Sequence, residues 1–480
     1  MKRVFVLFLL FTSCTLYPPY HRPSFESADE WRTPLNTDGA VDIGWWKQFG
    51  DESLNHLIDE ALANNQDLKV AIARVDAFQA QLGIVRSQLY PQIELDGQGD
   101  HHKNSSNNTS PPSSGKQILN AFNFIFHASY LLDLWGEVRS AVEASYHDYL
   151  ASIEARRIVV LAIVSDVANT YVQLRQFDQQ LVIAKKTVED RARYYYLAKV
   201  RFDLGLTSEM PVEQALTEIE VAQVDVENFQ IAIAQTENLL SVLIGKSSIA
   251  IDRGIPLDGL SMPPAVPSCL PSEIVSQRPD LRAAEQRLMS AGAQIGVAKA
   301  KFFPQISLTG NFGYESIQLN TLLNNQSNIW EYGANVLQEI FTGGRLISNL
   351  QLTQAQQREA LHSYLSTLLN AFKEVNDALI SHKINLELVE TQRKRLEATQ
   401  NYLRFSNLLY QEGETDYLTF LDAERQFYRS EIDYEEAKGN SFLSLVRIYQ
   451  ALGGGWVFDA DAVALDQDGR CEKYKGGAID

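Results

Sequence analysis

Apolar and polar side chains alternate directly after a proline corner at two places in the chain. The first corner reads QLGIVRSQLYPQIELDG from Gln81, and the second reads QIGVAKAKFFPQISLTG from Gln294. A helical pattern runs up to each proline, which cannot continue a helix and biases the preceding residue toward extended backbone. Beyond the proline the apolar period changes from 3.6 to 2. Each corner therefore predicts a helix that leads into a strand, and the constant offset of 213 residues predicts an internal duplication.

The same alternation predicts a second strand in each half. In the first half, phenylalanines and other apolar residues share one face of this second strand. The other face carries Asn123, His127 and Ser129, together with Ile125 and Leu131. Strands of about 9 to 11 residues with one apolar, aromatic face suit a membrane β-barrel, although one such strand alone would equally suit a soluble sheet. The predicted strands are 91–99 and 122–132 in the first half and 304–314 and 329–338 in the second.

Long stretches that favour helix follow each strand pair. A helix of about 65 residues rises roughly 100 Å, a length typical of coiled-coil rods. Glycines at Gly205 and Gly413 interrupt the rods at matching places, so each half predicts an antiparallel helical hairpin. The predicted rod helices are 136–203 and 210–245 in the first repeat and 343–410 and 416–452 in the second.

These patterns divide the chain into two repeats with additional segments. The apolar run from Val4 to Phe11 is too short to cross a bilayer and predicts an export signal. Thr12-Ser13-Cys14 resembles a bacterial lipobox, which implies a lipid on Cys14, and Thr15 favours the outer membrane by the same resemblance. The predicted segments are a signal peptide 1–13, an extended arm 14–44, repeat 1 at 45–245, a linker 246–278, repeat 2 at 279–452 and a tail 453–480.

Composition and motifs exclude several classes of function. The formal charge of −18 argues against a nucleic-acid partner. The sequence contains no nucleophile, zinc-protease or phosphate-loop motif, so we expect no enzyme and no cofactor. His101 and His102 stand in an expected polar loop without further ligands, so we expect no metal site. Cys269 and Cys471 lie in a chain bound for a compartment that permits disulfides, and they either pair or remain unrelated thiols.

Four strands cannot close a membrane barrel, because an open edge would expose unpaired backbone groups to lipid. The smallest closed barrels have eight strands, so the chain must oligomerise, and a trimer would supply twelve. The predicted fold class is therefore an α+β membrane protein, internally duplicated, with two strands and one long helical hairpin in each repeat. A homotrimer would form a 12-stranded β-barrel with a polar lumen above a tunnel of rod helices.

Ordered motifs along the chain resemble the TolC family of outer-membrane efflux factors, and most of all its lipoprotein NodT-type branch. The resemblance implies a lipid-anchored outer-membrane trimer with a periplasmic α-helical tunnel and an equatorial domain near residues 40–64, 246–278 and 453–480. It also implies a periplasmic adaptor and an inner-membrane pump of the resistance-nodulation-division class as partners. The motifs are WWKQFGD, both Y/F-P-Q-I corners, LDLWGEVR at Leu132, GLTS at Gly205, RPDLRAAE at Arg278, FTGGR at Phe341 and YLTFLDAERQ at Tyr417.

The two hairpin tips are the candidate functional residues. By resemblance, the first tip contacts the adaptor, and its alternative is a plain helix-hairpin turn. The acidic second tip would hold a periplasmic gate, and its alternative is a set of solvated carboxylates. The adaptor-contact residues are Leu204, Gly205, Leu206, Thr207, Ser208 and Gly413, and the gate residues are Glu412, Glu414 and Asp416.

The leading function predicted from the sequence is a passive exit duct for small molecules, driven by the pump through the adaptor. Two alternatives remain open. The same duct would serve a type I protein secretion system if its partner were an ABC exporter. A lipid-anchored coiled-coil scaffold without a pore is the other, but it would give the four strands no purpose.

Overall fold

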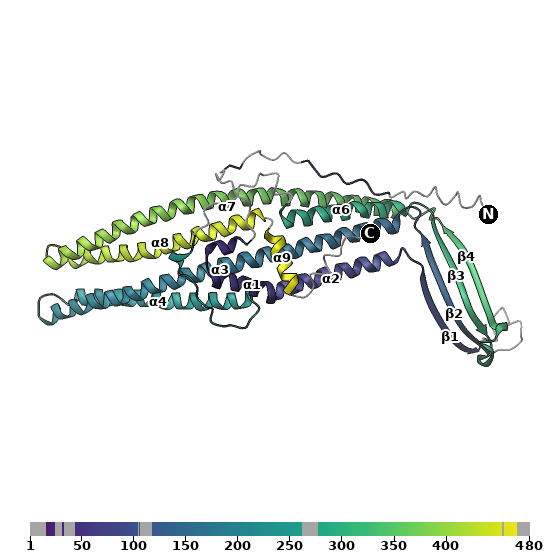
Figure 1. The fold of residues 1–480 in the computed structure, drawn as a ribbon, viewed down its shortest axis with the longest axis horizontal. Helices are drawn as coiled ribbons and strands as arrows, with labels where there is room; N and C mark the ends of the chain where they lie inside the picture. The colour runs from purple at the N-terminus through teal and green to yellow at the C-terminus, as the bar shows by residue number, and fades with distance from the viewer. Residues whose placement is uncertain are drawn as a thin grey trace. The chain divides into compact units, whose positions relative to one another are not determined.

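The computed structural model describes residues 16–24, 31–32, 44–103, 105, 118–261, 277–453 and 456–467. Contacts divide the chain into two compact units, whose elements are labelled in Figure 1. The first unit comprises Met1–Ser24, Arg74–Ser152 and Ala283–Leu365, and the second comprises Phe25–Ala73, Ile153–Arg282 and Ser366–Asp480.

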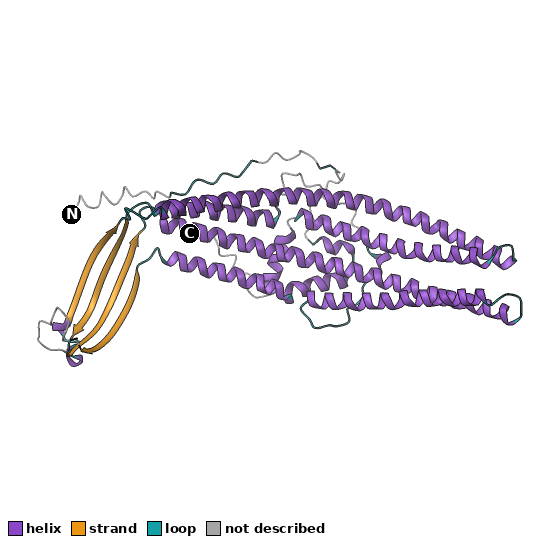
Figure 2. Ribbon diagram, turned by 180° about the vertical axis from the view of Figure 1, so that it is seen from behind, coloured by secondary structure: helices purple, strands orange, loops and turns teal. Residues whose placement is uncertain are grey.

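The first unit contains one four-stranded sheet in the order β1-β2-β3-β4, and all neighbouring strands are antiparallel (Figure 2). Pro91 and Pro304 directly precede β1 and β3, as the corner pattern predicts. β1 and β4 are the two edges of this sheet, so each has one row of backbone groups without a strand partner. The strands are β1 (Gln92–Lys103), β2 (Ile118–Leu132), β3 (Gln305–Ser316) and β4 (Asn328–Leu337).

Cross-strand register gathers large apolar side chains on one face of the sheet. One row joins Leu95, Phe126, Phe312 and Trp330 across all four strands. Trp330 is 68% exposed and stacks on Tyr332 with ring centroids 5.6 Å apart. A single chain thus leaves this aromatic row exposed, as is typical of a surface that an apolar environment or another molecule covers.

β1 is longer than the sequence pattern predicts. The strand continues through His101 and His102, so the prediction that these residues lie in a loop is wrong. His101 pairs with Asn120 and His102 with Leu119 in the ladder to β2. Backbone hydrogen bonds to a neighbouring strand thus override a polar composition that is typical of loops.

Four long helices follow the strand pairs and form two hairpins. Each begins and ends within two residues of its predicted bounds, and α3 and α7 continue without interruption for 67 and 68 residues. Within the described part of the chain, none of the helices combines the length and apolar character that a bilayer crossing requires. The long helices are α3 (Glu137–Asp203), α4 (Met210–Leu243), α7 (Arg345–Glu412) and α8 (Tyr417–Leu452).

Aromatic rings fill the core of the second unit. Trp45 is fully buried and stacks on Tyr449 of α8 with ring centroids 4.8 Å apart, while Trp456 meets Trp45 edge-on at 6.1 Å. Trp456 begins a helix in the tail, for which the sequence pattern predicts no structure. The shorter helices are η2 (Trp45–Phe49), α1 (Glu52–Asn64), α2 (Gln66–Ser87), α6 (Pro279–Ala300) and α9 (Trp456–Gln467), together with the three-residue helices η3 (Leu257–Gly259), η4 (Leu319–Thr321) and η5 (Asn325–Ser327).

Candidate functional site

The first hairpin tip is a tight turn that presents two leucines to solvent. Gly205 has φ +71°, a backbone conformation that residues with a side chain rarely adopt. The Leu206 N–H donates to the Arg201 carbonyl at 2.9 Å, which closes the end of α3 in a Schellman-type turn. Leu204 and Leu206 are 68% and 71% exposed. A glycine turn with two projecting apolar side chains has the form of a contact surface for another protein.

The second tip repeats this turn with acidic residues. Gly413 has φ +78°, and the Glu414 N–H donates to the Leu409 carbonyl at 2.9 Å. Asp416 caps α8, because its Oδ1 accepts hydrogen bonds from the Thr419 backbone N–H at 2.9 Å and hydroxyl at 2.7 Å. These bonds lower the pKa of Asp416. The carboxylate of Asp416 is therefore engaged in capping, and Glu412, Glu414 and Asp416 are all exposed.

A buried ion network behind the tips is absent from the sequence predictions. Arg191 of α3 binds both carboxylate oxygens of Glu424 of α8 at 3.0 Å and donates to the Glu218 carbonyl of α4 at 2.6 Å. Arg425 of α8 donates to the Glu218 carboxylate at 2.9 Å. Burial raises the pKa of Glu424. Charged residues at helix-facing positions signal such a network, but only the packing reveals which charges pair.

Two further contacts fasten one hairpin to the other. The Tyr428 hydroxyl of α8 donates to Asp225 of α4 at 2.8 Å. Arg201 of α3 lies over the ring of Tyr410 of α7, 5.4 Å from its centroid. The two hairpins are thus linked by ionic, hydrogen-bond and cation–π contacts close to their turns.

Glu431 of α8 is a partly buried carboxyl whose pKa is shifted by burial and by charges on both hairpins. Burial, with help from Glu435 and Glu424 and against Lys186, raises the pKa of Glu431 to about 7. A carboxyl whose pKa is raised by folding binds more protons in the native state than in the unfolded state between its two pKa values. Its contribution to stability is therefore fully present below about pH 4.5 and is lost as the pH rises through 7.

We expect Glu431→Gln to stabilise the protein at pH 8 by about 1 to 2 kcal/mol, after allowance for partial solvent screening, and to change little at pH 4.5. Thermal unfolding of the purified parent and variant at both pH values measures this difference. An equal difference at both pH values would contradict the assignment of a raised pKa to Glu431.

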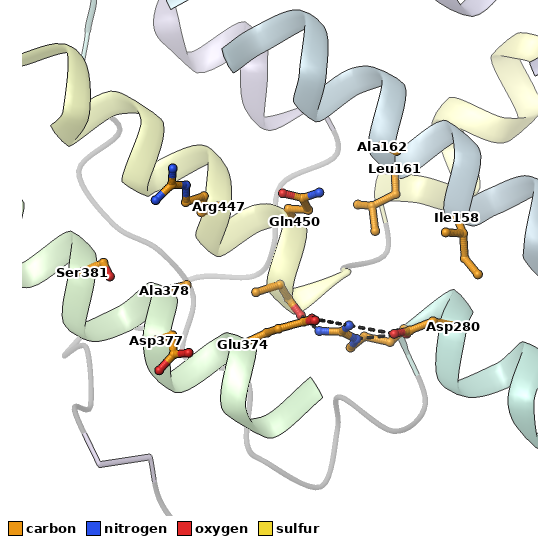
Figure 3. A pocket seen from close by; sticks show the side chains of 12 residues that line it. Ile158, Leu161, Ala162, Asp280, Glu374, Asp377, Ala378, Ser381, Arg447 and Gln450 are labelled. Atoms are coloured by element: carbon orange, nitrogen blue, oxygen red, sulfur yellow. Dashed lines mark hydrogen bonds and ion pairs between the residues drawn. The ribbon is translucent and has the colours of Figure 1, made fainter. Parts of the chain in front are cut away.

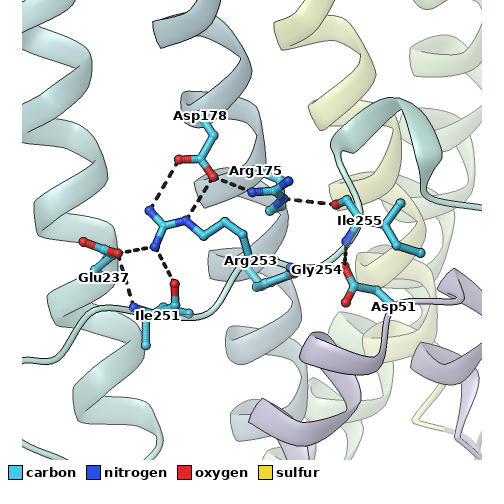
Figure 4. A network of polar contacts seen from close by, with 9 residues as sticks. Asp51, Arg175, Asp178, Glu237, Ile251, Arg253, Gly254 and Ile255 are labelled. Carbon is cyan, nitrogen blue, oxygen red and sulfur yellow. Dashed lines mark hydrogen bonds and ion pairs between the residues drawn. The ribbon is translucent and has the colours of Figure 1, made fainter.

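Asp51, from the WWKQFGD motif, joins three segments of the second unit, and Figure 4 shows its contact with Ile255. It is fully buried and caps α1 by accepting hydrogen bonds from the Ser53 and Leu54 backbone. Its other oxygen accepts from the Tyr171 hydroxyl at 2.7 Å and the Ile255 N–H at 3.0 Å. A Cβ on Gly254 would lie 2.0 Å from Asp51, so only glycine fits there. These contacts hold α1, α3 and the segment after α4 together.

A pocket of about 430 Å³ lies between α3, α6, α7 and α8 (Figure 3). Arg278, from the RPDLRAAE motif, donates to the Ala451 carbonyl at 2.6 Å and to Asp280 and Glu374 at 2.7 Å. Because the guanidinium is occupied by these partners, Arg278 has a structural role in the pocket wall. It joins the start of α6 to α7 and to the end of α8.

The same motif holds the arm that follows the proposed lipid site. The carboxylate of Glu285 accepts hydrogen bonds from the Tyr20 hydroxyl at 2.7 Å and from Arg22 at 2.7 and 2.8 Å. Residues 16–24 are therefore anchored on α6 of the first unit. Cys14, Cys269 and Cys471 lie outside the described residues, so the lipid site and the disulfide remain predictions.

The face of the sheet opposite the aromatic row is mainly polar, although it also carries Ile125, Leu131 and Ile329. One cross-strand row joins Glu94, His127, Asn311 and Glu331. A His127 ring nitrogen lies 2.8 Å from the Asn311 side-chain oxygen, and the Asn311 amide donates to Glu331 at 3.1 Å. The sheet therefore has one mainly apolar face and one mainly polar face.

Comparison with known sequences finds a protein family that covers most of the chain. The profile of the family described as outer membrane efflux protein matches residues 57–246 and 270–454. The chain is 35% identical to the probable efflux pump outer membrane protein TtgC of Pseudomonas putida KT2440, over 92% of this chain and 93% of that protein. It is 32% identical to the cation efflux system protein CusC of Escherichia coli K12, over 94% of this chain and 98% of that protein.

Solved structures with the same fold also cover most of the chain. The outer-membrane channel OprN superposes with a TM-score of 0.84 at 26% identity, over 92% of this chain and 100% of that one. The open state of the Neisseria gonorrhoeae MtrE outer membrane channel superposes with a TM-score of 0.83 at 30% identity, over 92% of this chain and 99% of that one.

Proposed function

Because the chain belongs to the outer membrane efflux protein family, we propose that it is the exit duct of a tripartite efflux system. Three copies would join their sheets into a 12-stranded barrel in the outer membrane and their hairpins into a periplasmic tunnel. A lipid on Cys14 would add a membrane anchor. Transport energy would come from an inner-membrane pump of the resistance-nodulation-division class, through a periplasmic adaptor.

The observation that carries this proposal is the two-faced sheet with two open edges. Its aromatic row needs an apolar environment, its polar row suits a water-filled lumen, and its edge strands need partners. The amphipathic pattern is that of a barrel wall in which lipid-facing and lumen-facing residues alternate. Glu94 and Glu331 on the polar face would make such a lumen favour cations.

Exposed apolar side chains on the helices support association of several copies. Several apolar residues on α4 and on α7 are uncovered in the single chain, as expected for surfaces that pack against neighbouring copies. They include Val221, Val224, Ile231, Leu239 and Val242 on α4, and Leu369, Ile380, Ile384, Phe405 and Leu408 on α7.

The hairpin tips are the proposed docking end. Leu204 and Leu206 would seat against the adaptor. Glu412, Glu414 and Asp416 would line the periplasmic opening and hold its resting gate. Relatives named for toluene, antibiotic and cation efflux have similar identities, so we propose that the pump selects the substrate. The efflux-pump names of these relatives favour efflux over the type I secretion alternative.

Conductance of the purified protein in a planar bilayer, together with its mass under native conditions, tests the proposal. We expect a trimer mass and a cation-selective conductance. Heat-denatured protein in the same detergent is the control for detergent-induced pores. A monomer that never conducts would overturn the duct and favour the scaffold alternative.

A further inference from the structure

Two large apolar side chains project from the segment that connects β4 to α7. Ile340 and Phe341 are 96% and 91% exposed, the highest values among the exposed large hydrophobic residues of the described chain. Adjacent apolar side chains left this open indicate a surface that another molecule covers.

Local contacts hold this segment in a defined bend. An ion pair between Arg345 and Glu339 spans it, and the Gln338 amide donates to the Phe302 carbonyl at 3.3 Å. Gly343 and Gly344 have φ values of +58° and +88°, which let the chain reverse toward α7. The bend therefore projects Ile340 and Phe341 instead of folding them inward.

The topology of the sheet identifies what can cover them. β1 and β4 are the open edges, and they run in opposite directions because each neighbouring pair in the sheet is antiparallel. When β4 of one copy pairs with β1 of the next, that pair is antiparallel too. Full pairing of the 10 residues of β4 with the 12 of β1 can place Leu337 opposite Gln92. The residues after β4 then lie beside the residues before β1 of the neighbouring copy.

We propose that Ile340 and Phe341 of one copy pack against Tyr90 of the next copy. The contact lies directly beyond the end of each β4–β1 pair that joins two copies, and it closes the gap between the copies there. Tyr90 is 60% exposed and stands two residues before β1, so its ring is available at that position. The contact uses different surfaces on the two copies, and three such contacts close a ring. The inference rests on the proposed function, because it requires the edge strands of separate copies to pair.

Within one chain, Tyr90 and Ile340 lie beside opposite edges of the sheet, so they are too far apart across it to make this contact. Tyr90 precedes one edge strand and Ile340 follows the other, and three strand spacings of about 4.8 Å separate these edges. A short cross-link between the two positions is therefore expected to join different copies.

Cysteine cross-linking tests the proposal in the full-length protein. Cys269→Ser and Cys471→Ser remove the other thiols, Cys14 is kept for its lipid, and Tyr90→Cys is combined with Phe341→Cys. A short bismaleimide added to membranes is expected to give covalent dimers and trimers on a denaturing gel. The matched control replaces Phe341→Cys by Ile317→Cys, which is 72% exposed but lies at the far end of the sheet, after β3. It is expected to remain monomeric.

The possible results test the contact between copies and the proposed duct function separately. A conducting trimer in which the Tyr90–Phe341 pair gives no covalent oligomers would overturn the contact and leave the duct intact. Quenching of a fluorophore at Phe341→Cys by lipid-borne quenchers in that trimer would assign the two side chains to lipid. Absence of any trimer in the parent would overturn the proposed function and this inference together.

Discussion

Replacement of Arg191 by methionine is expected to lower the free energy of unfolding by about 3 to 5 kcal/mol. The side chain is 4% exposed and binds both carboxylate oxygens of Glu424 at 3.0 Å. Methionine fills similar space but leaves buried Glu424 without the guanidinium that binds both its oxygens, and leaves Glu218 with Arg425 as its ion-pair partner. Denaturant unfolding of the purified protein, or thermal unfolding where that is irreversible, measures the loss.

An exposed ion pair on α7 provides the matched control. Arg393 contacts Glu390 at 2.9 Å, but both side chains are 50% exposed, so Arg393→Met is expected to have no measurable effect. Addition of Glu424→Gln to Arg191→Met should recover part of the loss, since it removes one uncompensated buried charge. An Arg191→Met protein as stable as the parent would show that the network contributes no stability.

Gly205→Asp is expected to reduce efflux at least tenfold while the amount of trimer at the outer membrane stays unchanged. Aspartate tolerates a positive φ better than most residues, so the turn should persist. The new carboxylate would lie between Leu204 and Leu206, which are the proposed anchors for the adaptor. A loss of about 1.4 kcal/mol or more at such a contact corresponds to a tenfold weaker association. Dye efflux from the native host, with the trimer quantified by gel, gives both quantities.

Gly205→Asn separates charge from backbone strain. Asparagine has nearly the same size and tolerates the same φ, so it should retain more efflux than the aspartate variant. Loss of the trimer in Gly205→Asp would assign Gly205 a structural role in the turn. Unchanged efflux in Gly205→Asp would remove the first tip from the adaptor contact.

Local signals account for the parts of the fold that the sequence predicts. Pro91 and Pro304 mark the strand starts, and Gly205 and Gly413 mark the hairpin turns, because each acts through its own backbone. The strand faces follow from the same local period. The tip residues are therefore found where they were predicted, as exposed turns, although their partners are still proposals.

Long-range contacts account for the parts that the sequence does not predict. Arg191 and Glu424 are separated by 233 positions, and no local pattern relates them. The helix from Trp456 depends on aromatic packing against Trp45, and Asp461 in it is buried against Arg156 at 2.7 Å. β1 extends through His101 because β2 lies beside it. In each case tertiary contacts override the local composition.

The open edges of the sheet have a genetic consequence. In the proposed ring of three, every copy would supply one edge to each neighbour, so one defective β4 edge would leave the whole ring open. Cells that make equal amounts of normal and edge-defective chains would assemble only about one in eight rings entirely from normal copies, if mixing is random. Alleles that damage the β4 edge without preventing assembly should therefore be dominant, whereas alleles that unfold the chain before assembly should be recessive.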